Sequence, residues 1–169
     1  MSDLTTTTDA FYHGQVVIKQ LKKGYRFAVD SPILAAYLPR STRPALEVGC
    51  GVGVISLLAL KRKKFPTVTG IEIQDPLYRL AVENAEANGM AARFHVIRGD
   101  FRRIHGGLAN VQTIFCNPPF FRADRGKVSP DPTISLARFE IALDLPGLLP
   151  GCAACLAPRG RLYMVLPFS

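Results

Sequence analysis

The chain has 169 residues, of which 48% are hydrophobic and 20% are charged, and its formal net charge is +8. This length corresponds to one domain, and the apolar content allows a sizeable core and excludes a chain that is disordered throughout. No apolar run is long enough for a membrane-spanning helix, and the N-terminus lacks the pattern of a secretion signal. The four cysteines do not suggest a disulfide framework in a chain this apolar, so we expect a reducing cytoplasm. The excess of basic residues favours an anionic partner, most simply nucleic acid.

The N-terminal part of the sequence predicts one hairpin and one helix. Residues 1–14 are expected to be loose and flexible. Residues 16–22 and 26–29, on either side of Gly24, predict a short hairpin. An aspartate, a serine and a proline then form a typical helix start, and residues 33–38 predict the helix that follows.

The rest of the chain alternates between strand patterns and helix patterns. This alternation predicts an α/β fold with a mostly parallel sheet and helices on both faces, in a single domain over residues 15–169. Pro146 and Pro150 interrupt the last helical region, which predicts that this helix is kinked or starts late. The predicted strands cover residues 45–48, 67–73, 94–98, 113–116 and 161–166, and the predicted helices cover residues 54–62, 76–88 and 137–156.

A glycine-rich turn, Glu47-Val48-Gly49-Cys50-Gly51-Val52-Gly53, lies between a predicted strand and a predicted helix. Glycines let the backbone turn sharply and approach a ligand closely. Two further acids, Glu72 and Asp100, lie at the ends of the next two strands. Because the carboxyl ends of parallel strands meet at one edge of a sheet, the three acids are expected to lie where open α/β sheets bind ligands.

The spacing in this turn also indicates the type of ligand. A dinucleotide fingerprint has the pattern G-x-G-x-x-G, but Val54 stands where its last glycine would be. The observed pattern is E-x-G-x-G-x-G, which places Glu47 at the mouth of the turn. A carboxylate there suits a ligand with an ammonium group, a sulfonium and an adenosine, which is S-adenosylmethionine (SAM).

The segment Asn117-Pro118-Pro119-Phe120 follows the fourth predicted strand at the same edge. The prolines hold the backbone extended, so the Pro118 carbonyl is fixed in direction, and the Asn117 side chain offers a second acceptor oxygen. Two converging acceptors suit a planar NH₂ group, whose lone pair they direct toward an electrophile. Phe120 offers a flat face on which a base can stack.

These motifs together resemble the class I, Rossmann-like methyltransferases that methylate amines and carry a (D/N/S)-P-P-(Y/F) motif. The resemblance covers about residues 15–168. Gly24-Tyr25-Arg26, Leu34-Ala35-Ala36 and residues 117–121 are most similar to the bacterial tRNA adenine-N6 methyltransferases, which modify an adenine beside the anticodon of valine tRNA. Members of this class usually continue past the fifth strand, so we expect the C-terminal strands to be lacking here.

The resemblance implies roles for individual residues. Asn117 and the Pro118 carbonyl would hold the target amine, with Pro119 and Phe120 completing the catalytic motif. The implied cofactor-binding residues are Asp30, Glu47, Gly49, Cys50, Gly51, Gly53, Glu72, Ile73, Asp100, Phe101 and Asn117. Among them, Glu47, Gly49 and Gly51 would line the methionine part, Glu72 would bind the ribose hydroxyls, and Asp100 with Phe101 would bind the adenine.

The polar stretch after the motif is expected to meet the RNA. Its basic residues are placed to contact phosphates, and the candidate substrate-binding residues are Phe120, Phe121, Arg122, Arg125 and Lys127. The leading hypothesis is methylation of adenine N6 in tRNA. The alternatives are methylation of a guanine amine in ribosomal RNA, methylation of a glutamine amide in a protein, and an RNA-binding scaffold without chemistry.

No metal site is expected. Cys152-x-x-Cys155 lacks a second such pair and a nearby histidine, so we interpret it as helix packing. The oligomeric state does not follow from the sequence.

Overall fold

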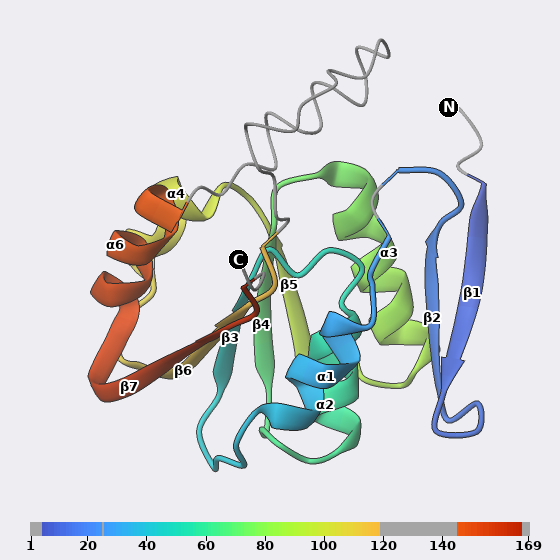
Figure 1. The fold of residues 1–169 in the computed structure, drawn as a ribbon, viewed down its shortest axis with the longest axis horizontal. Coiled ribbons are helices and arrows are strands. Elements are labelled where there is room, and N and C mark those ends of the chain that lie inside the picture. The colour runs from blue at the N-terminus through green and yellow to red at the C-terminus, as the bar shows by residue number, and fades with distance from the viewer. Residues whose placement is uncertain (1–4, 25, 119–144, 167–169) are drawn as a thin grey trace, which may run out of the picture.

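Five parallel strands form the central sheet of the computed structural model, which describes residues 5–24, 26–118 and 145–166 (Figure 1). The strands are β3 (Ala45–Val48), β4 (Val68–Glu72), β5 (Phe94–Arg98), β6 (Val111–Cys116) and β7 (Leu156–Met164). Their order is β5-β4-β3-β6-β7, and every neighbouring pair is parallel. The chain therefore builds outward from β3 through β4 to β5 and then reverses to β6 on the other side of β3. Such a reversal opens a crevice at the carboxyl ends of the strands, where open α/β sheets bind ligands.

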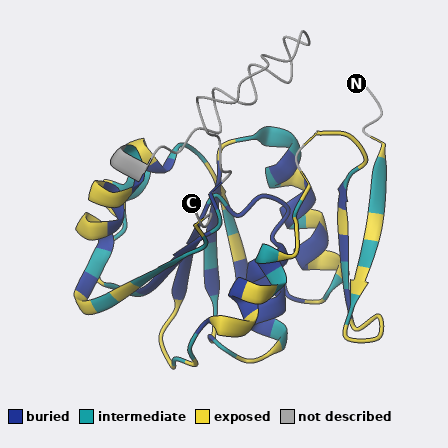
Figure 2. Ribbon diagram, viewed as in Figure 1, coloured by how far each residue is buried: buried dark blue, intermediate teal, exposed yellow. Residues whose placement is uncertain are grey.

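Helices cover both faces of this sheet, as the sequence predicts. One face carries α1 (Asp30–Tyr37), α2 (Val54–Lys61) and α3 (Asp75–Ala87), and the other carries the short α4 (Phe101–Ile104) and α6 (Leu145–Cys155) (Figure 1). Helix α2 is the most deeply placed, because all of its residues from Val54 to Leu60 are buried. The core is accordingly divided into two clusters, one on each face (Figure 2).

The central elements lie close to their predicted positions. Strand β3 has the predicted bounds, α2 ends one residue before the predicted helix does, and α3 both starts and ends one residue earlier than predicted. Helix α1 starts earlier than predicted, at Asp30, so that Pro32 lies within its first turn, where a missing backbone N–H costs little. Helix α4 and the 3₁₀ turn His105–Gly107 were not predicted.

The N-terminal hairpin differs from the prediction. Thr6–Phe11, within the segment predicted to be loose, forms β1 and pairs antiparallel with β2 (Val16–Leu21), whereas residues 26–29 form no strand. The β-branched threonines favour an extended backbone, and Gly14 at φ +83° supplies the left-handed turn between the strands. Val16 and Ile18 of β2 are completely buried, so the hairpin packs on the core as part of the same domain.

Candidate functional site

The glycine-rich turn lies between β3 and α2 at the carboxyl edge of the sheet. Gly49, Gly51 and Gly53 all have positive φ values, of 70°, 55° and 84°, which residues other than glycine rarely adopt. The backbone N–H groups of Gly49 and Cys50 both donate to the carbonyl of Ile71, at 2.9 and 3.0 Å. The end of β4 therefore holds the first two residues of the turn in a fixed position.

Glu72 links the turn to the next strand and helix. Its Oε2 accepts a 2.8 Å hydrogen bond from the Gly51 N–H, and its Oε1 accepts a 2.8 Å bond from the Gln74 N–H. Only 4% of Glu72 is exposed. Burial raises the pKa of this carboxyl, and the two backbone donors oppose that rise. The carboxyl group therefore has a fixed orientation beneath the glycine-rich turn.

Glu47 does not lie at the mouth of the turn. Along β3 it faces the same side of the sheet as Ala45, and this side is covered by α2. Its carboxyl is 1% exposed and accepts a short hydrogen bond from the Ser56 hydroxyl in α2. Burial raises its pKa to about 8, although the hydrogen bonds from Ser56 act in the opposite direction.

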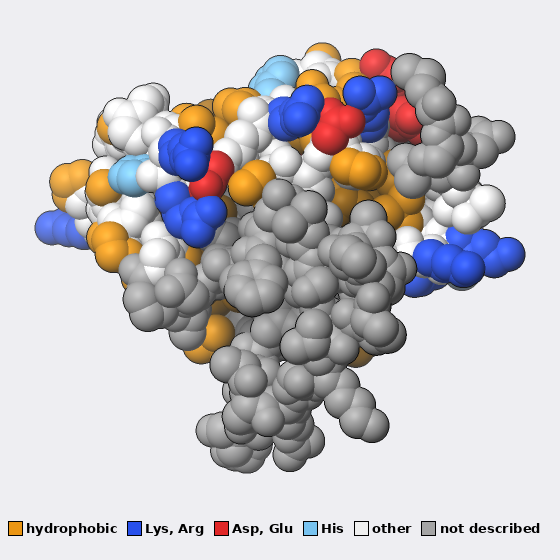
Figure 3. All heavy atoms as spheres, turned by 90° about the horizontal axis from the view of Figure 1, so that it is seen from above, with side chains coloured by type: hydrophobic (Ala, Val, Ile, Leu, Met, Phe, Trp, Pro, Cys, Tyr) orange, Lys and Arg blue, Asp and Glu red, His pale blue; other side chains and the backbone are white. Residues whose placement is uncertain are grey.

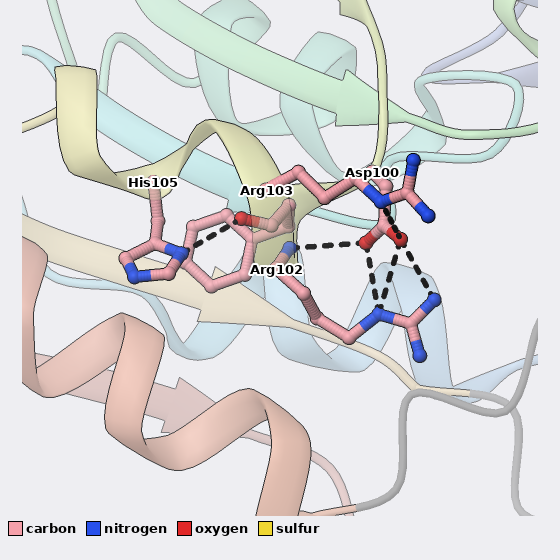
Figure 4. Close-up of polar contacts among 5 residues, drawn as sticks. Asp100, Arg102, Arg103 and His105 are labelled. Atoms are coloured by element: carbon pink, nitrogen blue, oxygen red, sulfur yellow. Dashed lines mark hydrogen bonds and ion pairs between the residues drawn. The ribbon is translucent and has the colours of Figure 1, made fainter.

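Asp100 caps α4 at the end of β5. Its Oδ1 accepts a 3.0 Å bond from the Arg102 backbone N–H, and both carboxylate oxygens accept bonds from the Arg102 guanidinium (Figure 4). Arg103 adds a longer ion pair at 3.9 Å. The hydrogen bond from the Arg102 side chain holds the pKa of Asp100 below its usual value, so this acid is ionised at neutral pH.

Asn117 directly follows β6, on the other side of β3 from Glu72 and Asp100. Its Nδ2 donates a 3.1 Å hydrogen bond to the hydroxyl of Ser31, a residue of α1 that is only 1% exposed. Pro118 is buried beside it. The first half of the Asn-Pro-Pro-Phe motif thus lies across the switch point from the glycine-rich turn and is held by α1.

The remaining predicted residues have mixed placements. Cys50 is buried at 3% exposure, and its Sγ would lie 2.9 Å from a Cβ added at Gly70. Phe101 is also buried, in the second core cluster, whereas Ile73 is 36% exposed beside Glu72. Asp30 lies half-buried in the first turn of α1. Six predicted residues lie outside the described part of the chain: Pro119, Phe120, Phe121, Arg122, Arg125 and Lys127.

The polar residues that support the site were not predicted from the sequence. Ser31 and Ser56 bind Asn117 and Glu47, and Asn84 of α3 and its C-cap residue Asn88 bind the hairpin. The two asparagines carry a recognisable signal, because they continue the apolar stripe of α3 at helical spacing and are nevertheless polar. A polar side chain at a core-facing position generally has a partner.

Ionic pairs occupy the described part of the carboxyl edge. Figure 3 looks onto this edge and shows basic side chains next to acidic ones. Asp75 pairs with Arg79 and Arg98 at 2.8 Å each, and Asp100 pairs with Arg102 at 2.7 Å. The described residues contain no cluster of His, Cys, Asp or Glu that could hold a metal ion.

The Cys-x-x-Cys pair lies on α6, and both of its thiols are free and buried in the second core cluster, which confirms the packing interpretation. None of the described helices has the length and apolarity needed to cross a membrane.

Comparison with known proteins identifies relatives that are named as tRNA methyltransferases. A protein of Tolumonas auensis named tRNA1(Val) (adenine(37)-N6)-methyltransferase is 31% identical over 160 residues, which are 94% of this chain and 66% of that protein. A protein of the same name from Aliivibrio salmonicida is 29% identical over 86% of this chain and 61% of its own length. The chain therefore spans about two thirds of the length of these relatives.

Solved structures support the same fold. TrmN from Thermus thermophilus superposes with a TM-score of 0.59 at 25% identity, covering 79% of this chain and 37% of that one. A SAM-dependent methyltransferase from Thiobacillus denitrificans has a TM-score of 0.57 at 22% identity, covering 85% of this chain and 50% of that one. The profile of the methyltransferase small domain matches residues 26–134, from before α1 to beyond the Asn-Pro-Pro-Phe motif. With that match over more than half of its length, the chain belongs to the methyltransferase small domain family.

Proposed function

We propose that this protein transfers a methyl group from SAM to the N6 amine of an adenine in tRNA, and that it acts in the cytoplasm. The names of the relatives from Tolumonas auensis and Aliivibrio salmonicida support the tRNA adenine as the substrate. The observation that carries the proposal is the position of Asn117, which follows β6 where the strand order reverses beside β3 and is held there by Ser31.

The Asn117 side chain has the chemistry that an exocyclic amine requires. Its Nδ2 is directed to Ser31, and its Oδ1 is the atom that we assign to the amine of the target base. The Pro118 carbonyl is the second acceptor. An exocyclic amine is a weak nucleophile because its lone pair is delocalised into the ring, and two acceptors for its hydrogens direct that lone pair out of the plane. Catalysis then rests on position and electrostatics rather than on a strong base.

The residues at the carboxyl edge fit SAM by their chemistry. Glu72 is held by two backbone donors, and each carboxylate oxygen has further lone pairs with which to accept from the vicinal ribose hydroxyls. Asp100 is ionised, and one of its oxygens would accept from the adenine amine in place of a bond from the Arg102 guanidinium. The left-handed turn at Gly49 and Gly51 allows close approach of the methionine part. When bound, SAM supplies an electrophilic methyl group on a sulfonium.

The net charge of +8 supports an RNA substrate. The predicted binding of that RNA by Phe121, Arg122, Arg125 and Lys127 remains a prediction, as does stacking of the target base on Phe120. Removal of these basic side chains should weaken RNA binding and make it less dependent on salt. The slope of log K against log salt concentration should decrease by about one for each phosphate that is no longer neutralised.

The test is incubation of the protein with methyl-labelled SAM and total RNA from cells that lack the activity, followed by digestion and identification of the labelled nucleoside. Label in N6-methyladenosine from the tRNA fraction is the expected result. Label in N2-methylguanosine from ribosomal RNA would replace the proposed substrate with the alternative base. No label in RNA, with binding of the cofactor confirmed by titration, would indicate a glutamine amide in a protein, and binding of RNA without binding of SAM would indicate a scaffold.

A further inference from the structure

Asn84 of α3 and Asn88, the C-cap residue of the same helix, pair with the free edge of β2. Asn88 accepts from the Val17 N–H at 2.8 Å and donates to the Val17 carbonyl at 2.7 Å. One turn earlier, Asn84 accepts from the Lys19 N–H at 2.8 Å and donates to the Lys19 carbonyl at 2.9 Å. A side-chain amide offers the same donor and acceptor as a peptide group, so the two asparagines replace a neighbouring strand on that edge.

The spacing of helix and strand explains why both asparagines can pair at once. Residues four apart on a helix are about 6 Å apart along its axis, and residues two apart on a strand are about 6.8 Å apart. Val17 and Lys19 both direct their backbone groups to the same side of β2. The 84/88 pair on α3 therefore matches the 17/19 pair on β2 closely enough for four hydrogen bonds.

The second hydrogen on the amide distinguishes the two asparagines. Asn88 Nδ2 donates to the Asn84 carbonyl, within its own helix, at 2.7 Å. Asn84 Nδ2 donates instead to the carbonyl of Val52, in the glycine-rich turn, at 2.9 Å. Asn84 and Val52 are each 1% exposed, so water does not reach this bond.

We propose that Asn84 is a positioning residue of the cofactor site, which holds the glycine-rich turn through the Val52 carbonyl and couples it to the N-terminal hairpin. The inference rests on the proposed function for the identity of the cofactor. One amide fixes both the edge strand of the hairpin and the turn, so movement of either disturbs the other. Gly51 and Gly53, which flank Val52, are the residues whose backbone should become mobile when this bond is removed.

Asn88→Ala is the matched control for Asn84→Ala. Each substitution removes two bonds to β2 and one further bond, and the further bond reaches the glycine-rich turn only in the case of Asn84. Both should therefore loosen the hairpin, but only Asn84→Ala should leave a buried carbonyl of the turn without its donor. Asn84→Ser is a second variant, with a smaller change in volume and a hydroxyl too short to span both partners.

Two measurements test the proposal. The first is amide hydrogen exchange in the ligand-free protein, read at Gly51 and Gly53, whose N–H groups donate to Glu72 and to the Cys50 carbonyl. The second is the Kd of S-adenosylhomocysteine by titration calorimetry. We expect Asn84→Ala to speed exchange at both glycines and to raise the Kd, each by about tenfold, and Asn88→Ala to change both by less than about threefold.

Equal changes in the two variants would overturn the proposal, because the turn would then respond only to loosening of the hairpin. Unchanged exchange and Kd in both Asn84→Ala and Asn84→Ser would also overturn it. The exchange measurement needs no cofactor. Wild-type protein that fails to bind S-adenosylhomocysteine would contradict the proposed function, whereas slow exchange at Gly51 and Gly53 in Asn84→Ala would contradict this inference alone.

Discussion

The buried carboxyl of Glu47 should make the stability of this protein depend on pH, and Glu47→Gln should remove that dependence. The side chain is 1% exposed between β3 and α2, and burial raises its pKa from 4.5 to about 8. The uncharged amide of glutamine has a similar shape and can still accept the hydrogen bond from Ser56. The substitution therefore removes the titration with little change in packing.

The sign follows from the protons bound in each state. Between pH 4.5 and pH 8 the folded protein keeps the Glu47 proton, whereas the unfolded chain has released it. The free energy of unfolding therefore decreases as the pH rises through this window, by about 1.4 kcal/mol per pH unit, and levels off above the folded pKa. Between pH 5 and pH 8 the contribution of Glu47 is about 4 kcal/mol, a large part of the stability of an ordinary domain.

Urea denaturation at pH 5, 6, 7, 8 and 9 measures this contribution. We expect similar stabilities of wild type and Glu47→Gln at pH 5 and an increasing advantage of the variant up to pH 8. Glu72, whose pKa is also raised, contributes in the same direction in both proteins, so most of its contribution cancels in the difference. Glu83→Gln is the control, because this carboxylate is half exposed in an ion pair with Lys19. Its removal should change the free energy of unfolding by the same small amount at every pH of the series. Parallel curves for wild type and Glu47→Gln would refute the reasoning.

Three further substitutions test the site. Asn117→Ala should lower methyl transfer at least about a hundredfold while the Kd of S-adenosylhomocysteine changes less than about twofold, and retained transfer would contradict the role of Asn117. Ser31→Ala removes the acceptor that orients the Asn117 amide, so turnover should fall about tenfold with an unchanged KM for SAM in steady-state assays; full turnover would exclude Ser31 as its orienting partner. Gly53→Ala places a Cβ 2.5 Å from Phe94 Cε1 at a φ of +84° and should cost about 2–3 kcal/mol in urea denaturation. Gly106→Ala, whose Cβ would meet nothing within 4 Å, is its control, and equal destabilisation in the two would exclude the clash as the cause.

Local signals explain why the centre of the fold was predictable. β3 is a short buried strand that ends at a glycine turn, and α3 has Pro76 in its first turn and Gly89 just past its end. These signals act within a few residues, so the sequence alone is enough to locate the elements and to order them along the chain. The position of Glu72 and Asp100 at the carboxyl edge of the sheet was predictable for the same reason, because that prediction requires only the residue at which each strand ends.

The direction of the Glu47 side chain was not predictable in the same way. β3 is buried on both faces, so its sequence shows no alternation of polar and apolar residues that would assign Glu47 to one face. An acid beside a glycine turn therefore suggested the mouth of a ligand site. Only the register of β3 against β4 and β6, together with the position of Ser56 in the first turn of α2, shows that this carboxyl lies between β3 and α2.

The hairpin shows where local reasoning fails and what replaces it. Residues 26–29 are no less suited to a strand than the threonine run of β1, so local propensity could not choose the partner of β2. The choice depends on both edges of β2, one of which pairs with β1 while the other is occupied by Asn84 and Asn88, more than sixty residues away. Because these asparagines need the backbone of β2 at a fixed register, the hairpin is placed by the same helix that supports the glycine-rich turn. The N-terminal strands are thus connected to the glycine-rich turn through Asn84, and a change in the register of β2 would break the bonds that Asn84 and Asn88 make with Lys19 and Val17.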